Sequence, residues 1–303
     1  MKKVNNPKIH HFVCTRYLKS FTDREGFLHL YSKRSDKQLH QKPIKTMKRN
    51  KYYKQNWLPN DIDPNCLEKH SAAEIEPKGL DALNNLINAG NITDDDIAVI
   101  LHYLEFQRNR VPRQLDTFKK LKETTAKLIV SQTSEGRDAL RYCTITMKDS
   151  DRFNSMRTLS GILIPYFARM VWEVIKAEEG SYFITSDSPV TFLNEKFFPP
   201  TEPGIGLYGT MVVYPISSQH LLLMKHPEYE RGEKGAVDAL PPDIVDEDRT
   251  IEVRRDLLWD QKKVNRQNCL MYMQSQDFIA APSKDVLEDT IRHCPQHTFL
   301  PKF

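Results

Sequence analysis

Cysteine is scarce in this chain and follows no disulfide or metal-binding pattern. The 303 residues contain five cysteines, an odd number, and no two of them form a Cys-x-x-Cys pair. Scattered single cysteines exclude a disulfide framework and a zinc knuckle, and they are typical of reduced thiols in the cytosol. The five are Cys14, Cys66, Cys143, Cys269 and Cys294.

Long apolar runs are also missing. The most apolar long stretch runs from Leu159 to Ile175. Because Pro165, Arg169 and Glu173 interrupt it, it indicates an internal helix and not a membrane span. The first eleven residues include lysines, but no apolar segment follows them, which argues against a signal peptide. We therefore expect a cytoplasmic protein that does not enter the membrane.

Several common catalytic signatures are absent from the sequence. It contains no Gly-x-Ser-x-Gly nucleophile elbow and no His-Glu-x-x-His zinc motif. The glycine-rich stretch from Pro203 to Gly209 lacks the Lys-Ser/Thr ending and the following helix of a phosphate-binding loop, so we expect a connection or a lid there. Function must therefore be inferred from less specific features.

Composition and the order of patterns indicate the fold class. Hydrophobic residues make up 39% of the chain and charged residues 28%, which is typical of a globular protein, and the net charge of +4 is too small to identify a nucleic-acid binder. The patterns predict an α+β fold with N-terminal strands, a central helical region containing a proline-kinked helix, and a C-terminal mixed sheet with flanking helices. We interpret residues 1–303 as a single α+β domain, with a basic N-terminal part (1–58), a helical part (59–178) and a strand-rich part with C-terminal helices (179–303).

Hydrophobic periodicity and boundary residues predict the individual elements. We expect helices at residues 10–21, 67–87, 94–110, 115–131, 160–176, 252–274 and 283–293. We expect strands at residues 27–31, 182–186, 190–193, 209–214, 221–224 and 278–281. An acidic, proline-containing surface loop is expected at 231–248, and Ser283 is placed to cap the last helix.

Arg108 is the most informative single residue. In a helix at 94–110, it falls in the middle of the apolar stripe and not on the polar side. A guanidinium cannot lose its proton, so its burial requires a carboxylate or phosphate partner. We expect Arg108 to be buried and bonded to Asp187 or Glu105. The stripe consists of Ile97, Ile100, Leu101 and Leu104.

Polar residues surround Arg108 in the segment 104–113. Pro112 cannot donate a hydrogen bond and its ring presses on the carbonyl of Arg108, so the helix should kink beside the guanidinium. Freed carbonyls and polar side chains at such a kink suit a ligand. The alternative is a structural ion pair of Arg108 with Glu105 or with a distant acid. The residues expected to contact substrate here are Gln107, Arg108, Arg110 and Arg113.

A second polar cluster follows an apolar strand in the segment 183–190, Phe-Ile-Thr-Ser-Asp-Ser-Pro-Val. Asp187 could bind a divalent metal ion, act as a base or pair with Arg108, and Ser186 could contact substrate. In the alternative, Asp187 forms an Asx-type turn and satisfies local backbone amides. Three glutamates on the helix before Arg108 could supply a second metal ligand, but surface positions are the simpler interpretation: Glu68, Glu74 and Glu76.

Two adjacent histidines, His10 and His11, stand before an apolar helix. Adjacent side chains point in different directions, so at most one of them should face a site. A neutral imidazole near pH 7 suits a general base or a metal ligand, and packing or surface exposure is the alternative. No second histidine lies at a zinc-site spacing. We expect one of the pair to lie close to Arg108 and its carboxylate.

Positive charge is concentrated between Lys33 and Lys54, where nine lysines or arginines accompany a single acid. Aromatic residues interleave with this charge or flank it. Positive charge with stacking surfaces is typical of a nucleic-acid groove, and we expect Lys45, Lys48 and Arg49 to contact phosphates. The same composition also fits an ordinary solvated hairpin. The aromatic residues are Tyr31, Tyr52, Tyr53 and Trp57.

Taken together, these stretches resemble the bacterial family DUF4238, a domain of unknown function. Its members begin with His-His-x-Val-Pro-x-x-Tyr-Leu-x-x-Phe, carry Gln-x-x-Arg-x-Pro-type and Phe-Ile-Thr-Ser-Asp-x-Pro-Val segments, and end with an Asn-containing helix before a short strand. The chain departs from this pattern at Cys14, where the family has proline. Members resemble components found among mobile and defence genes, so the resemblance implies a nuclease-like effector. The matching stretches are His10 to Phe21, Gln107 to Arg113, Phe183 to Val190, and Asn265 to Ala281.

Our leading hypothesis is a metal-dependent or acid/base phosphodiesterase acting on RNA or DNA. Asp187 would hold Mg²⁺ or Mn²⁺, with Glu105 as a second carboxylate and His11 as general base or acid. Arg108 and Arg113 would neutralise the phosphate. The alternatives are a non-catalytic module that binds a nucleotide or a peptide, and a transferase that uses a dinucleotide. The sequence gives no indication of an oligomeric state.

Overall fold

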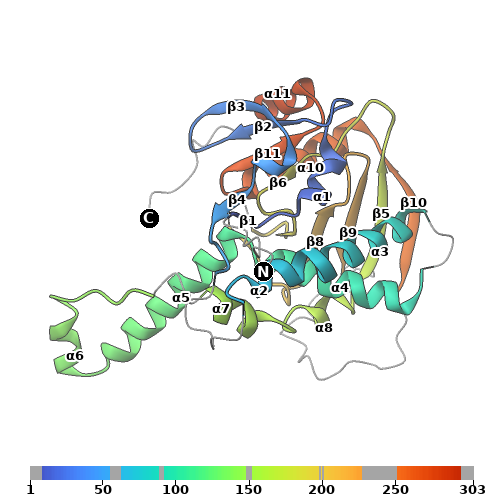
Figure 1. Cartoon of the computed structure of the whole chain (residues 1–303). Coiled ribbons are helices and arrows are strands. Elements are labelled where there is room, and N and C mark those ends of the chain that lie inside the picture. The colour runs from blue at the N-terminus through green and yellow to red at the C-terminus, as the bar shows by residue number, and fades with distance from the viewer. Residues whose placement is uncertain are drawn as a thin grey trace, which may run out of the picture.

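The computed structural model describes residues 9–54, 63–88, 92–147, 152–197, 199, 201–226 and 251–294. Within these residues the chain has the α+β fold that the sequence predicts, with helices on both sides of the largest sheet (Figure 1). The acidic loop predicted at 231–248 lies outside the described residues.

Five strands form the largest sheet, in the order β10-β5-β9-β8-β7. Neighbouring strands are antiparallel, except that β10 and β5 run parallel. All but one of the residues of β5 are buried, which makes it a core strand. The strands are β5 (Val171–Ala177), β7 (Thr191–Leu193), β8 (Met211–Pro215), β9 (His220–Lys225) and β10 (Val253–Trp259).

Helices cover both faces of this sheet. Side chains alternate between the two faces along each strand, so β5 contributes residues to both layers. Trp172 and Val174 of β5 pack in the core cluster that includes α3 and α4. Ile175 and Ala177 lie on the opposite face and pack against α10. Figure 1 shows α3 and α4 side by side along the sheet. The helices are α3 (Glu76–Asn88), α4 (Asp94–Asn109) and α10 (Gln261–Gln274).

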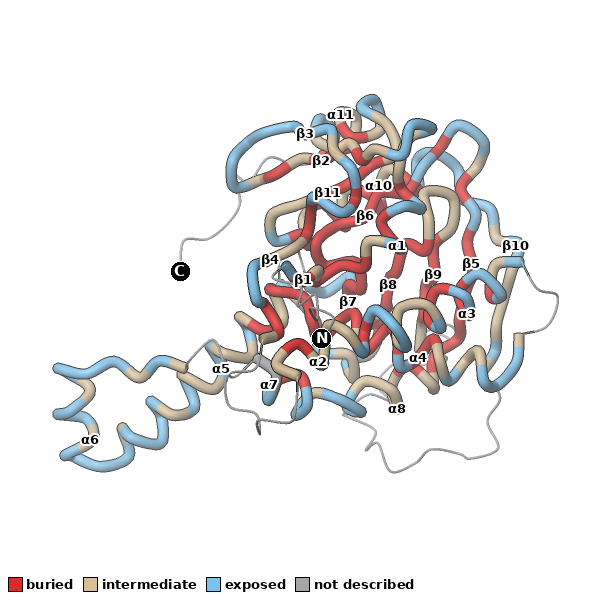
Figure 2. Tube along the Cα trace, in the orientation of Figure 1, coloured by how far each residue is buried: buried red, intermediate tan, exposed pale blue. Residues whose placement is uncertain are grey.

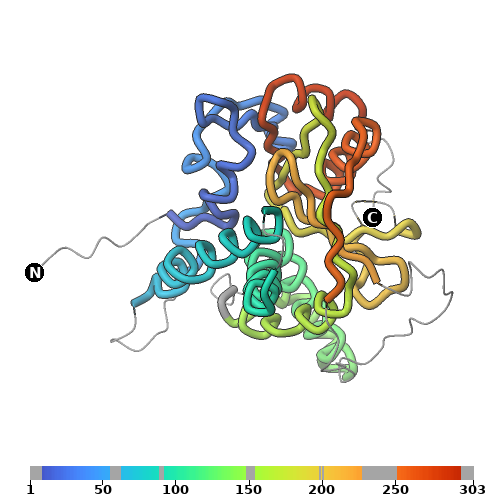
Figure 3. The backbone as a smooth tube through the Cα atoms, turned by 90° about the vertical axis from the view of Figure 1, so that its right-hand side faces the viewer, coloured from blue at the N-terminus to red at the C-terminus, as the bar shows by residue number. Residues whose placement is uncertain are grey.

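A second, antiparallel sheet joins the two ends of the chain. Its strand order is β3-β2-β11-β6, so an N-terminal hairpin pairs with a C-terminal strand. Figure 3 shows these blue and red segments together at one end of the molecule. The elements are β2 (Leu28–Ser32), β3 (Lys37–Gln41), β6 (Thr185–Ser186) and β11 (Phe278–Ala281), with α11 (Lys284–His293) packed beside them.

The first described residues form a strand, which corrects the helix predicted at 10–21. β1 pairs with β4, and Cys14 has an extended backbone before the short helix begins. Pairing with a distant strand outweighs the local helical pattern at the two histidines. The elements are β1 (Ile9–His11), α1 (Thr15–Leu18), η1 (Lys19–Phe21), η2 (Pro43–Lys45) and β4 (Lys48–Asn50).

The remaining helices include an arm that projects from the body. Figures 1 and 2 show α5 and α6 extending away from the sheets, with much of their length exposed. The predicted helix at 67–87 is present, with a π-helical turn inside it. The elements are α2 (Cys66–His70), the π turn η3 (Ser71–Ile75), α5 (Pro112–Val130), α6 (Ser134–Ala139), α7 (Arg152–Leu159) and α8 (Ile164–Phe167).

The predicted kink at Pro112 is a complete break between two helices. Helix α4 begins at a capping box formed by Thr93 and Asp96 and ends at Asn109. Val111 is then extended, with φ −73° and ψ 150°, and Pro112 occupies the first turn of α5. Proline lacks an N–H, so it starts a helix more readily than it continues one.

Two predicted helices are wrong in part. Residues 160–176 contain the short helix α8 and then the strand β5, and residues 252–274 contain the strand β10 before α10. β5 is buried on both faces, and periodicity does not distinguish its continuous apolar pattern from that of a buried helix. β10 is only partly buried, and its apolar and polar residues do not alternate as in a regular strand. The predicted strands lie within two residues of the observed ones, except that the strand at 182–186 is reduced to Thr185–Ser186. The strands β1, β3 and β4 were not predicted.

Burial follows the sheets, as Figure 2 shows: the red segments gather along the strands and the inner sides of the helices. Among the described residues, no helix is long and apolar enough to cross a membrane.

Candidate functional site

Arg108 is buried and bonded to a carboxylate, as the sequence predicts, but its partner is a different acid. Its Nη2 lies 2.6 Å from Oε2 of Glu202, and its Nη1 donates to the carbonyl oxygen of Val190 at 2.8 Å. The guanidinium also lies over the ring of Phe192, 4.1 Å from the centroid. The expected pairing of Arg108 with Asp187 or Glu105 is therefore wrong.

Glu202 was not recognised from the sequence. Burial alone would raise the pKa of this carboxyl, but the adjacent Arg108 outweighs it and lowers the pKa to about 2. Glu202 therefore carries its charge across the physiological range. It lies in the loop after β7, far along the chain from Arg108, and no local pattern marks such a partner.

Glu105 has a structural role in the described fold. Its Oε1 accepts the backbone N–H of Leu163 and its Oε2 accepts that of Gly161, both at 2.7 Å. These bonds hold the turn before α8 against α4. Both carboxylate oxygens are thus already hydrogen-bonded, which leaves little support for the catalytic role expected of Glu105.

Arg110 and Gln107, both expected to contact substrate, are fully buried. Nη1 of Arg110 lies 2.7 Å from Oε1 of Glu76 and 2.9 Å from Oγ of Ser71, and its Nε donates to Oε1 of Gln107 at 3.2 Å. Gln107 in turn donates to the backbone oxygen of Phe12 at 3.0 Å. Both residues connect α4 with the segments packed around it, so the expectation of direct substrate contact is corrected. Glu76 is likewise not the surface acid we expected.

The histidines contact a different part of the molecule from Arg108. The backbone N–H of His11 donates to Oε1 of Glu68 at 3.3 Å, and its ring Nε2 donates to the carbonyl oxygen of Ile44 at 3.1 Å. Nδ1 of His10 accepts the backbone N–H of Tyr53 at 2.9 Å. Burial lowers the pKa of His11 and raises the pKa of Glu68 to about 7. The hydrogen bonds of His11 therefore connect it to Glu68 and Ile44, and not to the Arg108 cluster.

Asp187 is buried and accepts three backbone N–H groups. Its Oδ1 accepts from Gln276 at 2.9 Å, and its Oδ2 accepts from Asp277 at 2.7 Å and from Phe278 at 2.9 Å. Burial raises the pKa of this carboxyl, and the three amides oppose the rise. The alternative interpretation, in which Asp187 satisfies backbone amides, matches this geometry, although the amides come from the distant segment before β11. Mg²⁺ and Mn²⁺ prefer oxygen ligands, and both oxygens of Asp187 are engaged here.

The polar segments 104–113 and 183–190 nevertheless lie in contact, as expected if both belong to one site. Arg108 bonds to Val190, which is three residues after Asp187. Arg113, mostly buried, donates to the backbone oxygen of Gln274, and burial lowers its pKa. Ser186 is fully buried, and its Oγ bonds to Sδ of Met271 at 3.2 Å, so it does not reach a surface ligand.

A cleft of about 310 Å³ lies next to this junction. Its lining comes from the segments 34–49 and 276–278 and from Phe12, Pro112 and Asp187. Three of the residues that we expected to contact phosphates line it: Lys45, Lys48 and Arg49. The cleft therefore combines the predicted basic segment with the predicted aspartate.

The cleft carries more positive than negative charge. Arg34 joins the three predicted cations, whereas Asp187 and Asp277 are its acids. Both carboxylates accept hydrogen bonds from the protein. Oδ1 of Asp277 accepts from Ser32 Oγ at 2.8 Å and from the N–H of Arg34 at 3.0 Å. An anionic ligand is therefore favoured in the cleft.

Further residues complete the lining of the cleft. Thr46 is one of them, but its hydroxyl is buried out of contact with solvent and has no hydrogen-bond partner among the described residues. Apolar side chains supply the rest of the wall: Phe12, Leu39, Met47 and Phe278.

Among the described residues, Asp23, His29 and His40 form a cluster that could hold a metal ion. The two histidines become neighbours through strand pairing and not through a close spacing along the chain, so no sequence motif marks this cluster.

Comparison with known proteins supports the resemblance seen in the sequence. No curated protein and no solved structure matches the chain. The family model described as a protein of unknown function (DUF4238) matches residues 9–285, which include both polar segments, the basic segment and both strands of the N-terminal hairpin. The chain therefore belongs to the family DUF4238.

Proposed function

We propose that this protein binds single-stranded nucleic acid in the basic cleft. The observation that carries the proposal is the concentration of four cations, Arg34, Lys45, Lys48 and Arg49, around a cleft that also offers apolar walls. Cations that follow the backbone and apolar surfaces that accept bases are the two requirements of single-strand binding.

The cations are positioned to reach phosphates. Lys45 is exposed, and Lys48 and Arg49 are partly exposed, so their charges remain available to a ligand. The guanidinium of Arg49 lies over the rings of Phe12 at 5.9 Å and Tyr52 at 5.5 Å, which limits its motion. A guanidinium held in this way can donate two hydrogen bonds to one phosphate.

The size and lining of the cleft favour a nucleotide over a bulky group. Its volume of about 310 Å³ is at the lower end of small-ligand sites. Phe278 and Leu39 provide apolar surface against which a base can pack.

We propose binding and not cleavage. The phosphodiesterase hypothesis needs a carboxylate that is free to hold Mg²⁺ or Mn²⁺. Asp187 lies in the cleft, but its oxygens accept three backbone N–H groups, and those of Glu105 accept two. A metal ion at either residue would have to displace these bonds.

Fluorescence anisotropy with labelled RNA and DNA strands tests the proposal, with cleavage followed on a gel in Mg²⁺, Mn²⁺ or EDTA. We expect binding that persists in EDTA, with the strand intact. Absence of binding to any strand contradicts the proposal. Metal-dependent cleavage that Asp187→Asn abolishes would instead support the phosphodiesterase.

A further inference from the structure

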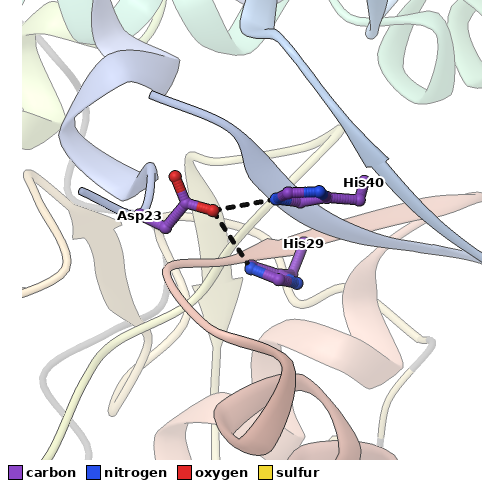
Figure 4. Close-up of side chains that lie close together, drawn as sticks. All are labelled: Asp23, His29 and His40. Atoms are coloured by element: carbon purple, nitrogen blue, oxygen red, sulfur yellow. Dashed lines mark hydrogen bonds and ion pairs between the residues drawn. The ribbon is translucent and has the colours of Figure 1, made fainter. Parts of the chain in front are cut away.

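We propose that Asp23, His29 and His40 bind one divalent transition-metal ion of the Zn²⁺ type. The three side chains come from the turn before β2, from β2 and from β3, and Figure 4 shows them converging. This site is independent of the cleft and of the function proposed for it.

The donor atoms already point at one another. Nε2 of His40 lies 2.8 Å and Nε2 of His29 lies 3.3 Å from the same oxygen, Oδ2 of Asp23 (Figure 4). All three donor atoms lie within 4.8 Å of one another. Ligand atoms on a tetrahedral zinc ion lie about 3.3 Å apart, from bonds of about 2 Å, so small side-chain rotations accommodate an ion.

The backbone holds the two imidazoles together. His29 and His40 are directly opposite in the β2–β3 hairpin, and their rings stack with centroids 4.4 Å apart. A shift of the pairing by one residue would move one ring to the other face of the sheet. The fold therefore fixes a histidine pair that the sequence spacing does not reveal.

Two backbone amides orient the carboxylate of Asp23. Oδ1 of Asp23 accepts the backbone N–H of Glu25 at 3.0 Å and that of Phe27 at 2.9 Å. Oδ2 is left to face the histidines. Partners of this kind, which orient a ligand without touching the ion, are typical of metal sites.

Two imidazole nitrogens and one carboxylate oxygen favour Zn²⁺ and similar ions over Mg²⁺ or Ca²⁺, which prefer oxygen ligands alone. The side chain of His40 is 46% exposed, so an ion and a completing water molecule have access from solvent.

The metal site and the cleft lie on opposite faces of the hairpin. Leu39 and Gln41 line the cleft, and His40 lies between them in the strand, so its side chain points to the other face. Metal binding and nucleic-acid binding can therefore be tested separately, and the failure of one leaves the other unaffected.

Isothermal titration calorimetry of the metal-free protein with ZnCl₂ tests the proposal. We expect one ion per chain with a Kd in the micromolar range or below. His29→Gln and His40→Gln should each weaken binding by more than about 100-fold, beyond the loss of 10- to 100-fold that removing an indirect partner causes. His102→Gln, which removes an exposed histidine of α4, is the matched control and should bind as the wild type does.

A spectroscopic readout on the wild type makes the test independent of whether the variants fold. One equivalent of Zn²⁺ should shift the imidazole ¹⁵N resonances of His29 and His40 and leave those of His102 in place. A Kd above about 1 mM, or unshifted resonances of this pair, contradicts the proposal. So does undiminished binding by folded His29→Gln and His40→Gln proteins.

Discussion

Arg108 on α4 and Arg110, which directly follows that helix, stand two positions apart and use different acids. Positions two apart on a helix point to different sides, so one guanidinium reaches Glu202 and the other reaches Glu76. The first pair ties α4 to the loop after β7, and the second ties it to the start of α3. Each buried charge thus connects the central helix to a separate part of the fold.

Glu202→Gln should lower the free energy of unfolding by about 3 kcal/mol, because it leaves the buried charge of Arg108 without its partner. Chemical denaturation measures the change. Glu195→Gln removes an exposed carboxylate from the same region and is the control. Equal stabilities of the two variants would contradict a structural role for the Arg108–Glu202 pair.

Glu68 should make stability depend on pH. Burial raises its pKa to about 7, so the folded protein favours the protonated form. Its contribution is therefore fully present below the ordinary pKa of about 4.3 and is lost as the pH rises through 7. We expect Glu68→Gln, which does not titrate, to gain stability relative to the wild type between about pH 5 and pH 8.

Thermal unfolding across this pH range measures the difference for Glu68. His11 titrates in the same window, with a lowered pKa, but it is present in both proteins and its direct effect cancels in the comparison. Parallel curves for the wild type and Glu68→Gln would show that this carboxyl does not titrate differently in the folded state.

For single residues, the sequence predicts the burial of Arg108 but not the identity of its partner. A charge within an apolar stripe is a local signal, whereas Glu202 is brought to it by the folding of β5 and β7 between them. Asp187 was predicted to hold a metal ion, act as a base or pair with Arg108, with an Asx-type turn as the alternative. The side chain is buried and accepts three backbone amides, and the sequence pattern does not separate a structural carboxylate from a catalytic one.

Some helix boundaries depend on local chemistry, and the sequence carries a signal for these. The capping box at Thr93, the cap at Ser283 and the break at Pro112 all follow from side-chain and backbone groups within a few residues. β10 was missed because its apolar and polar residues do not alternate, and β5 was missed because burial on a sheet, not local chemistry, determines it. A buried apolar run is compatible with either element.

Thr93→Ala should lower the free energy of unfolding by about 1 kcal/mol, because the hydroxyl that accepts the N–H of Asp96 is lost at the start of α4. Thr117→Ala makes the same substitution at an exposed position inside α5, where alanine is the better helix former, and should not destabilise. Denaturation of both variants checks this, and equal losses would contradict a specific capping contribution.

At the scale of the whole molecule, the cleft brings together candidate site residues from distant parts of the sequence. It gathers residues from the N-terminal strands, the start of α5, the segment after β6 and the segment before β11. The sequence shows the positive charge and the aspartate separately. Their meeting, and the opposite placement of Asp23, His29 and His40, depend on the second sheet, which pairs the two ends of the chain.

The salt dependence of oligonucleotide affinity tests the proposed function most directly, in a triple variant with Lys45, Lys48 and Arg49 replaced by alanine. The control replaces Lys262, Lys263 and Arg266, three exposed cations near the start of α10, and so matches the change in charge. If the cleft binds the strand, the first variant alone should lose affinity, and the slope of log K against log salt should fall by about 2, at about 0.7 for each phosphate contact. Equal affinities and equal slopes in the two variants would contradict the account.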